Sequence, residues 1–427
     1  MPTTLRATPD DEKNAFYWSV ADRAVRTVVE ALGEGDVDAV LMIGAPTRSE
    51  ATVVETDRGL YSLSDVDLIC IGGDDADCAE LKRRLAAPLA ALNREYDSSC
   101  TGIDVAVKKR HHLASPYPII ANYEMFRSPV VLWGDEGVRD SFGEVGIEDI
   151  PGIESLVLLH NRTVEELLLH RSVQQASGDR MTAVRILYRT AKLALDLVTA
   201  FLFLQKDVPT KYTERVELFV DDFLERPGFE RLKKNLSGYA GELRAWAHFK
   251  ATADLTALVN RFDRSAGTDD LSALARSLWF RYTRYVEVFW KTILGSVTHR
   301  DLTEADITTA AGAYSGLEPL PMRIARTLRV LRTDGYPDEL FSRARMLTRW
   351  RFASPVPLGH LTAVLAYLRF SDSIERDRLD VAVERYCPFA LPGGFRELSE
   401  DGKREILLNR LGLFHETVLL GRAARRS

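Results

Sequence analysis

Two aspartates separated by one residue, Asp65 and Asp67, stand directly before the apolar run 68–71. Side chains alternate between the two faces of a β-strand, so both carboxylates are expected on one face, with Val66 and Leu68 in a core on the other. Two like charges this close repel each other unless a cation lies between them. Carboxylate oxygens suit a hard divalent ion, and the sequence therefore predicts a Mg²⁺ site at the start of this strand.

A third carboxylate lies on a second predicted strand. In the segment 101–107, apolar residues alternate and define one face, while Asp104 interrupts the other face. If this strand belongs to the same sheet, Asp104 lies beside Asp65 and Asp67, and three carboxylates converge.

An apolar strand and a glycine precede these carboxylates. The strand, 39–43, ends at Gly44 and is followed by Arg-Ser-Glu at 48–50. The order of an apolar strand, a glycine, a spacer, Asp-x-Asp and a later lone aspartate resembles the nucleotidyltransferase superfamily of the DNA polymerase beta type. That superfamily includes antibiotic nucleotidyltransferases and adenylyltransferases, and the resemblance covers the first third of the chain.

The chain departs from the family pattern after the glycine. The family has Gly-Ser where this chain has Gly44-Ala45, so Thr47 or Ser49 would have to supply the missing hydroxyl. The spacer is also longer than in minimal members, and residues 51–63 are predicted to form a β-hairpin.

The resemblance implies transfer of a nucleoside monophosphate, AMP from ATP by default, to an acceptor hydroxyl with release of pyrophosphate. It implies two Mg²⁺ ions, with Asp104 as metal ligand, general base or both. The implied catalytic and metal-binding residues are Asp65, Asp67 and Asp104. The implied nucleotide-binding residues are Gly44, Arg48, Ser64 and Lys192.

Lys192 enters through a basic stripe on a predicted helix. Arg185, Arg189 and Lys192 lie at i, i+4 and i+7 and share one face. In the resembling family, basic residues after the catalytic sheet hold the triphosphate. Lys192 is the preferred candidate for that role, ahead of Lys211 and Arg215. The alternative is that the stripe is an ion-paired structural face.

Strand signals end near residue 151, and helical periodicity continues from there. The sequence predicts an α+β fold with a small mixed sheet, helices on one face of it, and a large all-α region. The expected domains are a nucleotidyltransferase-like catalytic domain, 1–150, a helical domain completing the nucleotide and acceptor cleft, 151–310, and a C-terminal helical subdomain, 311–427. The expected helices are 14–32, one capped by the segment 72–75 and running to about Tyr96, 153–176, 180–205, 210–225, 238–260, 268–296, 303–313, 319–334, 337–350, 357–370 and 400–423.

Composition limits the partners. The formal net charge of -6 over 427 residues argues against a general nucleic-acid-binding surface. No apolar stretch is long enough to span a membrane. The four cysteines show neither metal-ligand spacing nor a disulfide framework, which fits a reducing cytoplasm.

The residues do not specify the acceptor. A small hydroxylated molecule, similar to an aminoglycoside or a sugar, is the first expectation, together with a nucleoside triphosphate. A homodimer is one option for the assembly, and the residues leave the oligomeric state open. Three further functions stay open: modification of a protein side chain, synthesis of a signalling nucleotide, and nucleotide binding by a non-catalytic regulator.

Overall fold

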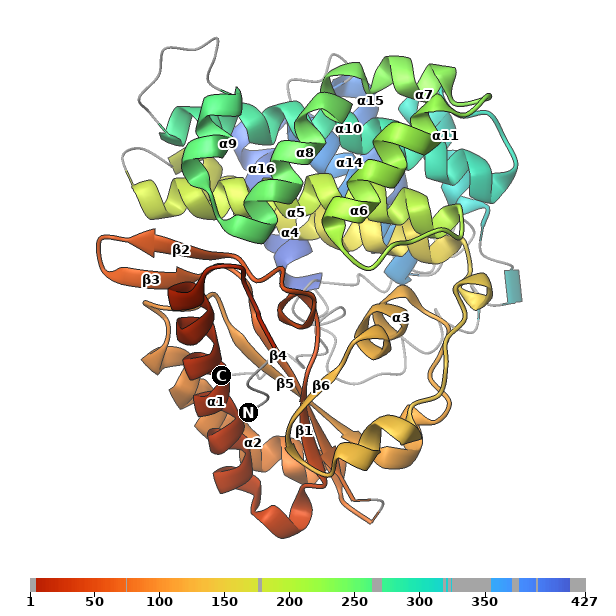
Figure 1. Ribbon diagram of the computed structural model, residues 1–427. Coiled ribbons are helices and arrows are strands. Elements are labelled where there is room, and N and C mark those ends of the chain that lie inside the picture. Colours follow the sequence, from red (N-terminus) through yellow and green to blue (C-terminus); the bar gives the residue numbers. More distant parts are fainter. Residues whose placement is uncertain are drawn as a thin grey trace. The chain divides into compact units, whose positions relative to one another are not determined.

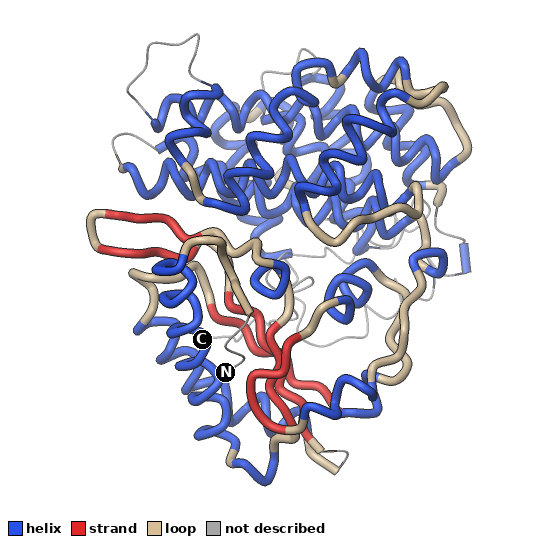
Figure 2. Tube along the Cα trace, in the orientation of Figure 1, coloured by secondary structure: helices blue, strands red, loops and turns tan. Residues whose placement is uncertain are grey.

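The computed structural model describes residues 5–73, 75–175, 179–262, 271–317, 320, 321, 324, 355–370, 376–388 and 391–414. Within these residues the chain has the predicted α+β fold. A small mixed sheet lies in the N-terminal part, and most of the remaining chain is helical. Figure 2 shows the strands, and all the described ones lie within residues 39–134.

Two compact units make up the chain. Unit 1 comprises Met1–Glu154, Gln205–Phe223 and Ala240–Gly267, and unit 2 comprises Ser155–Leu204, Leu224–Tyr239 and Thr268–Ser427. This division differs from the expected domains 151–310 and 311–427. Two segments of the expected middle domain join the sheet-containing unit, because they hydrogen-bond to it over long sequence separations. The expected boundary at 310 lies inside unit 2.

The sheet of unit 1 has the strand order β5-β4-β1-β6. Strands β4 and β5 are parallel, whereas β1 pairs antiparallel with both β4 and β6. The strands are β1 (Ala39–Met42), β4 (Val66–Gly72), β5 (Ile103–Lys109) and β6 (Val130–Gly134). The apolar run 68–71 within β4 suits an interior strand covered on both faces. A separate hairpin, β2 (Val53–Thr56) and β3 (Gly59–Ser62), confirms the predicted one.

Two long helices cover one face of the sheet (Figure 1). They are α1 (Asp11–Leu32) and α2 (Cys78–Glu95). Asp10 caps α1 by accepting a hydrogen bond from the Lys13 amide, and Asp77 caps α2 by accepting one from the Ala79 amide. The cap of α2 is therefore Asp77, just beyond the expected capping segment 72–75. The packed residues come from both helices and from the even positions of β4, and include Val20, Ala24, Val28, Leu81, Leu85, Leu68 and Cys70.

The two long helices thus lie on one face of the sheet, as expected, and the opposite face carries a smaller apolar cluster to which one short helix contributes. A short helix, α3 (Ile120–Arg127), contributes Met125 and Phe126 to this cluster, which is built on Leu41 and Ile69. Its eight residues span about two turns, too few for a clear periodic signal. A 3-10 turn, η2 (Ala45–Arg48), follows β1.

The remaining described elements are helical. Those of unit 2 are α4 (Ile153–Gln175) and η7 (Phe223–Glu225), which both start in unit 1, α5 (Arg180–Leu204), α7 (Glu230–Asn235), α10 (Leu271–Thr298), α11 (Ile307–Ser315), α14 (Pro355–Phe370), α15 (Arg376–Tyr386), η8 (Phe395–Glu397) and α16 (Glu400–Phe414). Those assigned to unit 1 are α6 (Tyr212–Glu217), the π-helix η6 (Leu218–Asp222), α8 (Ser237–Thr252), whose first turn is in unit 2, and α9 (Leu255–Phe262).

The helix boundaries differ from the expected ones in three places. The expected helix 238–260 is broken at Ala253, whose positive φ of 58° ends α8. Helices α7 and α15 were not predicted. Of the expected helix 319–334 only residues 320, 321 and 324 are described, and the expected helix 337–350 lies outside the described residues. Among the helices that are described, none is both long and apolar enough to cross a membrane.

Candidate functional site

The carboxylates of the expected metal site come from neighbouring strands. Asp67 on β4 lies directly opposite Asp104 on β5 in the parallel register. Asp65 stands just before β4 and has the same parity as Asp67, Ile69 and Ile71, and the two isoleucines pack into the cluster on the α3 face. The backbone therefore projects all three carboxylates from that face. Asp104 is exposed, whereas Asp65 and Asp67 are half-buried.

The side chains of Asp65 and Asp67 turn toward different neighbours. Asp67 Oδ2 lies 3.6 Å from the position a Cβ on Gly44 would take, and Asp65 Oδ1 lies 3.6 Å from the equivalent position at Gly102. Gly44 follows β1 and Gly102 precedes β5, the two strands that flank β4. In the part of the chain that is described, no three His, Cys, Asp or Glu side chains form a group that could hold a metal as they stand. The donors have the oxygen chemistry of a Mg²⁺ site, but sharing one ion requires side-chain rotation.

The negative charges of Asp65 and Asp67 act on a neighbouring thiol. Cys100 lies before β5, and its Sγ is 3.4 Å from the carbonyl oxygen of Gly102. Burial raises the pKa of the Cys100 thiol to about 11, and the negative charges of Asp65 and Asp67 act in the same direction. The carboxylates of Asp65, Asp67 and Asp104 themselves make this edge of the sheet negative, which favours a cation over an anion there.

Gly44 makes the turn that brings the chain past Asp67. Its φ of 84° and ψ of -153° lie in a region that is accessible mainly to glycine. Thr47 Oγ1 donates to the Gly44 carbonyl oxygen at 2.8 Å and lies 3.1 Å from Ser128 Oγ. Ser49 Oγ donates to the carbonyl oxygen of Arg6 at 2.7 Å. Both hydroxyls expected to replace the missing serine thus already hydrogen-bond within the protein.

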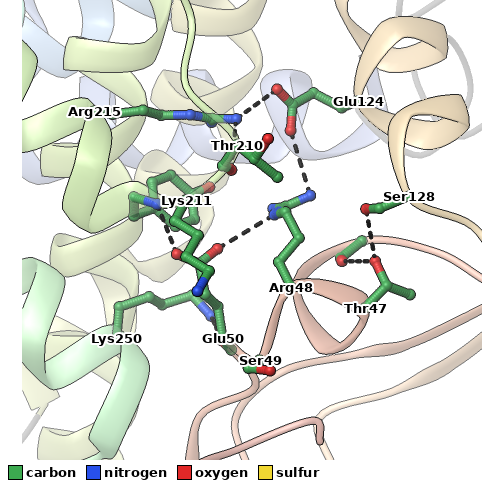
Figure 3. A network of polar contacts seen from close by, with 12 residues as sticks. Thr47, Arg48, Ser49, Glu50, Glu124, Ser128, Thr210, Lys211, Arg215 and Lys250 are labelled. Carbon is green, nitrogen blue, oxygen red and sulfur yellow. Dashed lines mark hydrogen bonds and ion pairs between the residues drawn. The ribbon is translucent and has the colours of Figure 1, made fainter. Parts of the chain in front are cut away.

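Arg48 lies between two carboxylates in a buried ionic network (Figure 3). Its Nε is 3.3 Å from Glu50 Oε2, its Nη1 is 3.4 Å from Glu124 Oε2, and Arg215 Nη2 donates to Glu124 Oε1 at 2.7 Å. The side chains of Arg48 and Arg215 are 7% and 2% exposed.

The network raises the pKa of Arg48. Burial alone lowers that pKa, but Glu124, Tyr212 and Glu50 outweigh it. Arg48 and Arg215 therefore tie η2, α3 and α6 together, and their contact with a nucleotide stays a prediction.

Ser64, expected to bind the nucleotide, is part of a second buried polar cluster. The residue is 3% exposed, and its Oγ accepts a hydrogen bond from the Thr52 amide at 2.9 Å. The ammonium of Lys250 lies 3.3 Å from the same oxygen and donates to the Glu50 carbonyl oxygen at 2.7 Å. Sequence reasoning missed Lys250, because 186 residues separate it from Ser64 and no local pattern indicates the contact.

The basic stripe that includes Lys192 lies on α5 in unit 2. Arg189 Nη1 lies 2.8 Å from Glu165 Oε2, and Arg162 pairs with both Glu165 and Asp196. Burial raises the pKa of Glu165, but Arg162, Lys192 and Arg189 more than compensate and hold it at about 2. The stripe is thus at least partly an ion-paired structural face, and the role of Lys192 toward a triphosphate stays a prediction.

Comparison with known protein families, curated proteins and solved structures finds no match for this chain. The function is therefore inferred from the arrangement of residues in unit 1.

Proposed function

We propose that this chain transfers a nucleoside monophosphate, AMP from ATP as the first choice, to the hydroxyl of a small acceptor and releases pyrophosphate. One observation carries the proposal: Asp67 and Asp104 lie directly opposite each other on parallel strands, with Asp65 on the same face. Like charges placed opposite one another destabilise a strand pair, and a bound cation relieves the repulsion. The proposal is also supported by the preceding glycine turn, which runs beside Asp67.

Mg²⁺ is the implied cofactor, and Asp65, Asp67 and Asp104 are the residues that would hold it after their side chains rotate inward. When bound, Mg²⁺ would neutralise charge on the triphosphate and lower the pKa of the acceptor hydroxyl.

The protein groups have separate roles in the proposed transfer. The exposed carboxylate of Asp104 takes the proton of the acceptor hydroxyl. The acceptor oxygen attacks the α-phosphorus, the bond from that phosphorus to the bridging oxygen breaks, and pyrophosphate leaves with the bond electrons. Gly44 has no side chain and leaves room for the triphosphate beside the carboxylates.

The test is pyrophosphate release from ATP and Mg²⁺ in the presence of a panel of aminoglycosides and sugars. Turnover is expected only with an acceptor. Asp67→Ala and Asp104→Ala should each lower it by at least about 100-fold. Asp57→Asn, in the exposed turn of the hairpin, is the matched control and should retain full activity. Unchanged turnover in both alanine variants would show that the assignment is wrong.

A non-catalytic nucleotide-binding module is the second candidate. The observation that favours it is the divergent orientation of Asp65 and Asp67, which among the described residues do not form a metal-holding group as they stand. Calorimetry that detects ATP binding by a protein without turnover would support this candidate.

Radiolabelled ATP distinguishes modification of a protein side chain from synthesis of a signalling nucleotide. In the first case the label would appear on the protein itself, and in the second it would appear on a small nucleotide product. Transfer to a metabolite would place the label on the added acceptor.

A further inference from the structure

We propose that Lys250 is a positioning residue for the proposed transfer, acting through the turn formed by Ser64 and Asp65. The inference depends on the proposed function, since it assigns Lys250 the task of orienting one of the three carboxylates. Lys250 lies near the C-terminal end of α8, far in sequence from the sheet-containing segments it contacts.

The ammonium of Lys250 joins both ends of the β2–β3 hairpin. Its Nζ lies 2.7 Å from the Glu50 carbonyl oxygen and 3.1 Å from Thr52 Oγ1, before the hairpin, and 3.3 Å from Ser64 Oγ, after it. An ammonium has three N–H donors, and these three oxygens match that number. Lys250 is 2% exposed, so displacing the ammonium from these acceptors would leave a buried charge poorly solvated.

The contacts around Lys250 are reciprocal. Thr52 Oγ1 donates to the carbonyl oxygen of Lys250 at 2.6 Å, and the Thr52 amide donates to Ser64 Oγ at 2.9 Å. Thr52 thus binds both the backbone of α8 and the side chain of Ser64. The hydrogen bonds among Lys250, Thr52 and Ser64 therefore form a closed ring, which restricts where the Ser64 backbone can lie.

The next residue, Asp65, is constrained by a different helix. Tyr17 Oη of α1 donates to the Asp65 carbonyl oxygen at 2.9 Å, and Ser62 Oγ donates to the Ser64 carbonyl oxygen at 2.7 Å. The peptide units on both sides of the Asp65 Cα are therefore held by buried groups, and Lys250 supplies part of the hold on the Ser64 side. Because the peptide planes determine the direction of the Cα–Cβ bond, Lys250 helps to aim the Asp65 carboxylate.

The position of Lys250 also indicates that it acts through neighbouring protein groups and does not contact the substrate directly. Its ammonium faces protein oxygens at the two hairpin ends and is buried in the interior of unit 1. The expected consequence of removing it is a misplaced carboxylate, which lowers the rate of the transfer step more than it changes the affinity for ATP.

The experiment compares Lys250→Met, Lys250→Arg and the control Lys13→Met. Lys13 also contacts α8, through the Thr252 carbonyl oxygen at 3.5 Å, but it does so from α1 and outside the cluster around Ser64. Lys250→Met should lower kcat roughly 10- to 100-fold with KM for ATP changed less than about twofold. Lys250→Arg, which keeps the charge and the donors, should recover most of kcat, and Lys13→Met should match the native chain.

A second measurement works without turnover. Mn²⁺ binding, followed by electron paramagnetic resonance, should weaken about tenfold in Lys250→Met and not in Lys13→Met, because Asp65 is a proposed ligand. If Lys250→Met does not fold, Thr52→Val removes one acceptor at nearly constant volume and should weaken Mn²⁺ binding in the same direction.

The outcomes distinguish the two proposals. Mn²⁺ binding without turnover by the native chain would refute the transfer reaction and leave the positioning of Asp65 to be judged by the Mn²⁺ data. Native kcat in Lys250→Met, or native Mn²⁺ affinity in that variant, would overturn the role of Lys250 alone. Absence of Mn²⁺ binding by the native chain would overturn both.

Discussion

Asp67 and Asp104 stand opposite each other on the parallel strands β4 and β5, as direct partners in the register. Neighbouring strands lie about 4.8 Å apart, so the two carboxylates repel at neutral pH unless a cation or a donor intervenes. One polar cluster of unit 1 includes Arg48 of the turn η2, which follows β1. The other includes Lys250 and Ser64, and Ser64 precedes β4.

Removing one carboxylate of the pair should have opposite effects with and without Mg²⁺. In a chelator at low ionic strength, Asp104→Asn should stabilise the fold by up to about 1 kcal/mol, because it removes repulsion. Mg²⁺ should raise the melting temperature of the native chain and leave that of the variant unchanged. Asp57→Asn is the control, and an equal response of native chain and Asp104→Asn to Mg²⁺ would contradict the shared site.

Gly44→Ala should cost stability through its backbone and place a methyl group in van der Waals contact with the Asp67 carboxylate, which limits the rotation that metal binding requires. The positive φ with an extended ψ is strained for alanine by about 1–3 kcal/mol, measurable as a lower free energy of unfolding in urea. Gly59 also has a positive φ, but a Cβ there would meet nothing within 4 Å. Gly59→Ala should therefore lose stability and keep the Mg²⁺ response, whereas Gly44→Ala should lose both. A native Mg²⁺ response in Gly44→Ala would argue against its place at the site.

Breaking the buried ionic network should be far more costly than breaking a surface pair. Glu124→Ala leaves Arg48 and Arg215 without a shared carboxylate, and we expect a loss of about 3–5 kcal/mol in the free energy of unfolding. Glu80→Ala removes the exposed pair with Arg83, whose side chains are 41% and 74% exposed, and should leave the free energy of unfolding nearly unchanged. Comparable losses in the two variants would mean that solvent screens the interior network.

Acidification should destabilise unit 2 through its buried histidines. Burial lowers the pKa of His360 to about 4, and burial, followed by the charge of Arg404, lowers that of His170 to about 4. His160 lies against His360, and burial lowers its pKa as well. Unfolding raises each pKa to the ordinary value near 6.5, so stability is complete above pH 6.5 and falls as the pH drops toward 4. In urea titrations from pH 8 to pH 4.5, His360→Phe should lose less stability than the native chain, whereas the exposed control His112→Asn should lose as much as the native chain.

Glu166 should change the stability of unit 2 with pH in the direction opposite to that of the histidines. Burial raises the pKa of Glu166 to about 7, partly offset by Arg189, while Glu165 adds to the rise. A raised carboxyl pKa means that its stabilising contribution is present below pH 4.5 and is lost as the pH rises through 7. Glu166→Gln should therefore gain stability relative to the native chain by roughly 3 kcal/mol between pH 4.5 and pH 8. A difference that does not change with pH would mean that Glu166 is ionised throughout.

Local patterns in the sequence identified much of the sheet. Alternation around Asp104, the apolar run after Asp67 and the turn at 56–59 each indicate a strand or hairpin through neighbouring residues alone. Short helices such as α3 and α15 were not predicted, because two or three turns give too weak a hydrophobic periodicity. The roles of Ser64 and Arg48 could not be read locally either, since their partners Lys250 and Glu124 lie far away in the chain.

The sequence by itself determined that Asp65 and Asp67 share one face of a strand, because the period of a β-strand is a property of the backbone. It also determined the α+β class, since the change from alternating to helical periodicity is visible along the chain. Only the tertiary structure decided that Asp104 stands opposite Asp67 and that Lys250 supports the turn before Asp65. Strand order and register arise from packing and hydrogen bonds between distant segments, and no local stretch of residues encodes them.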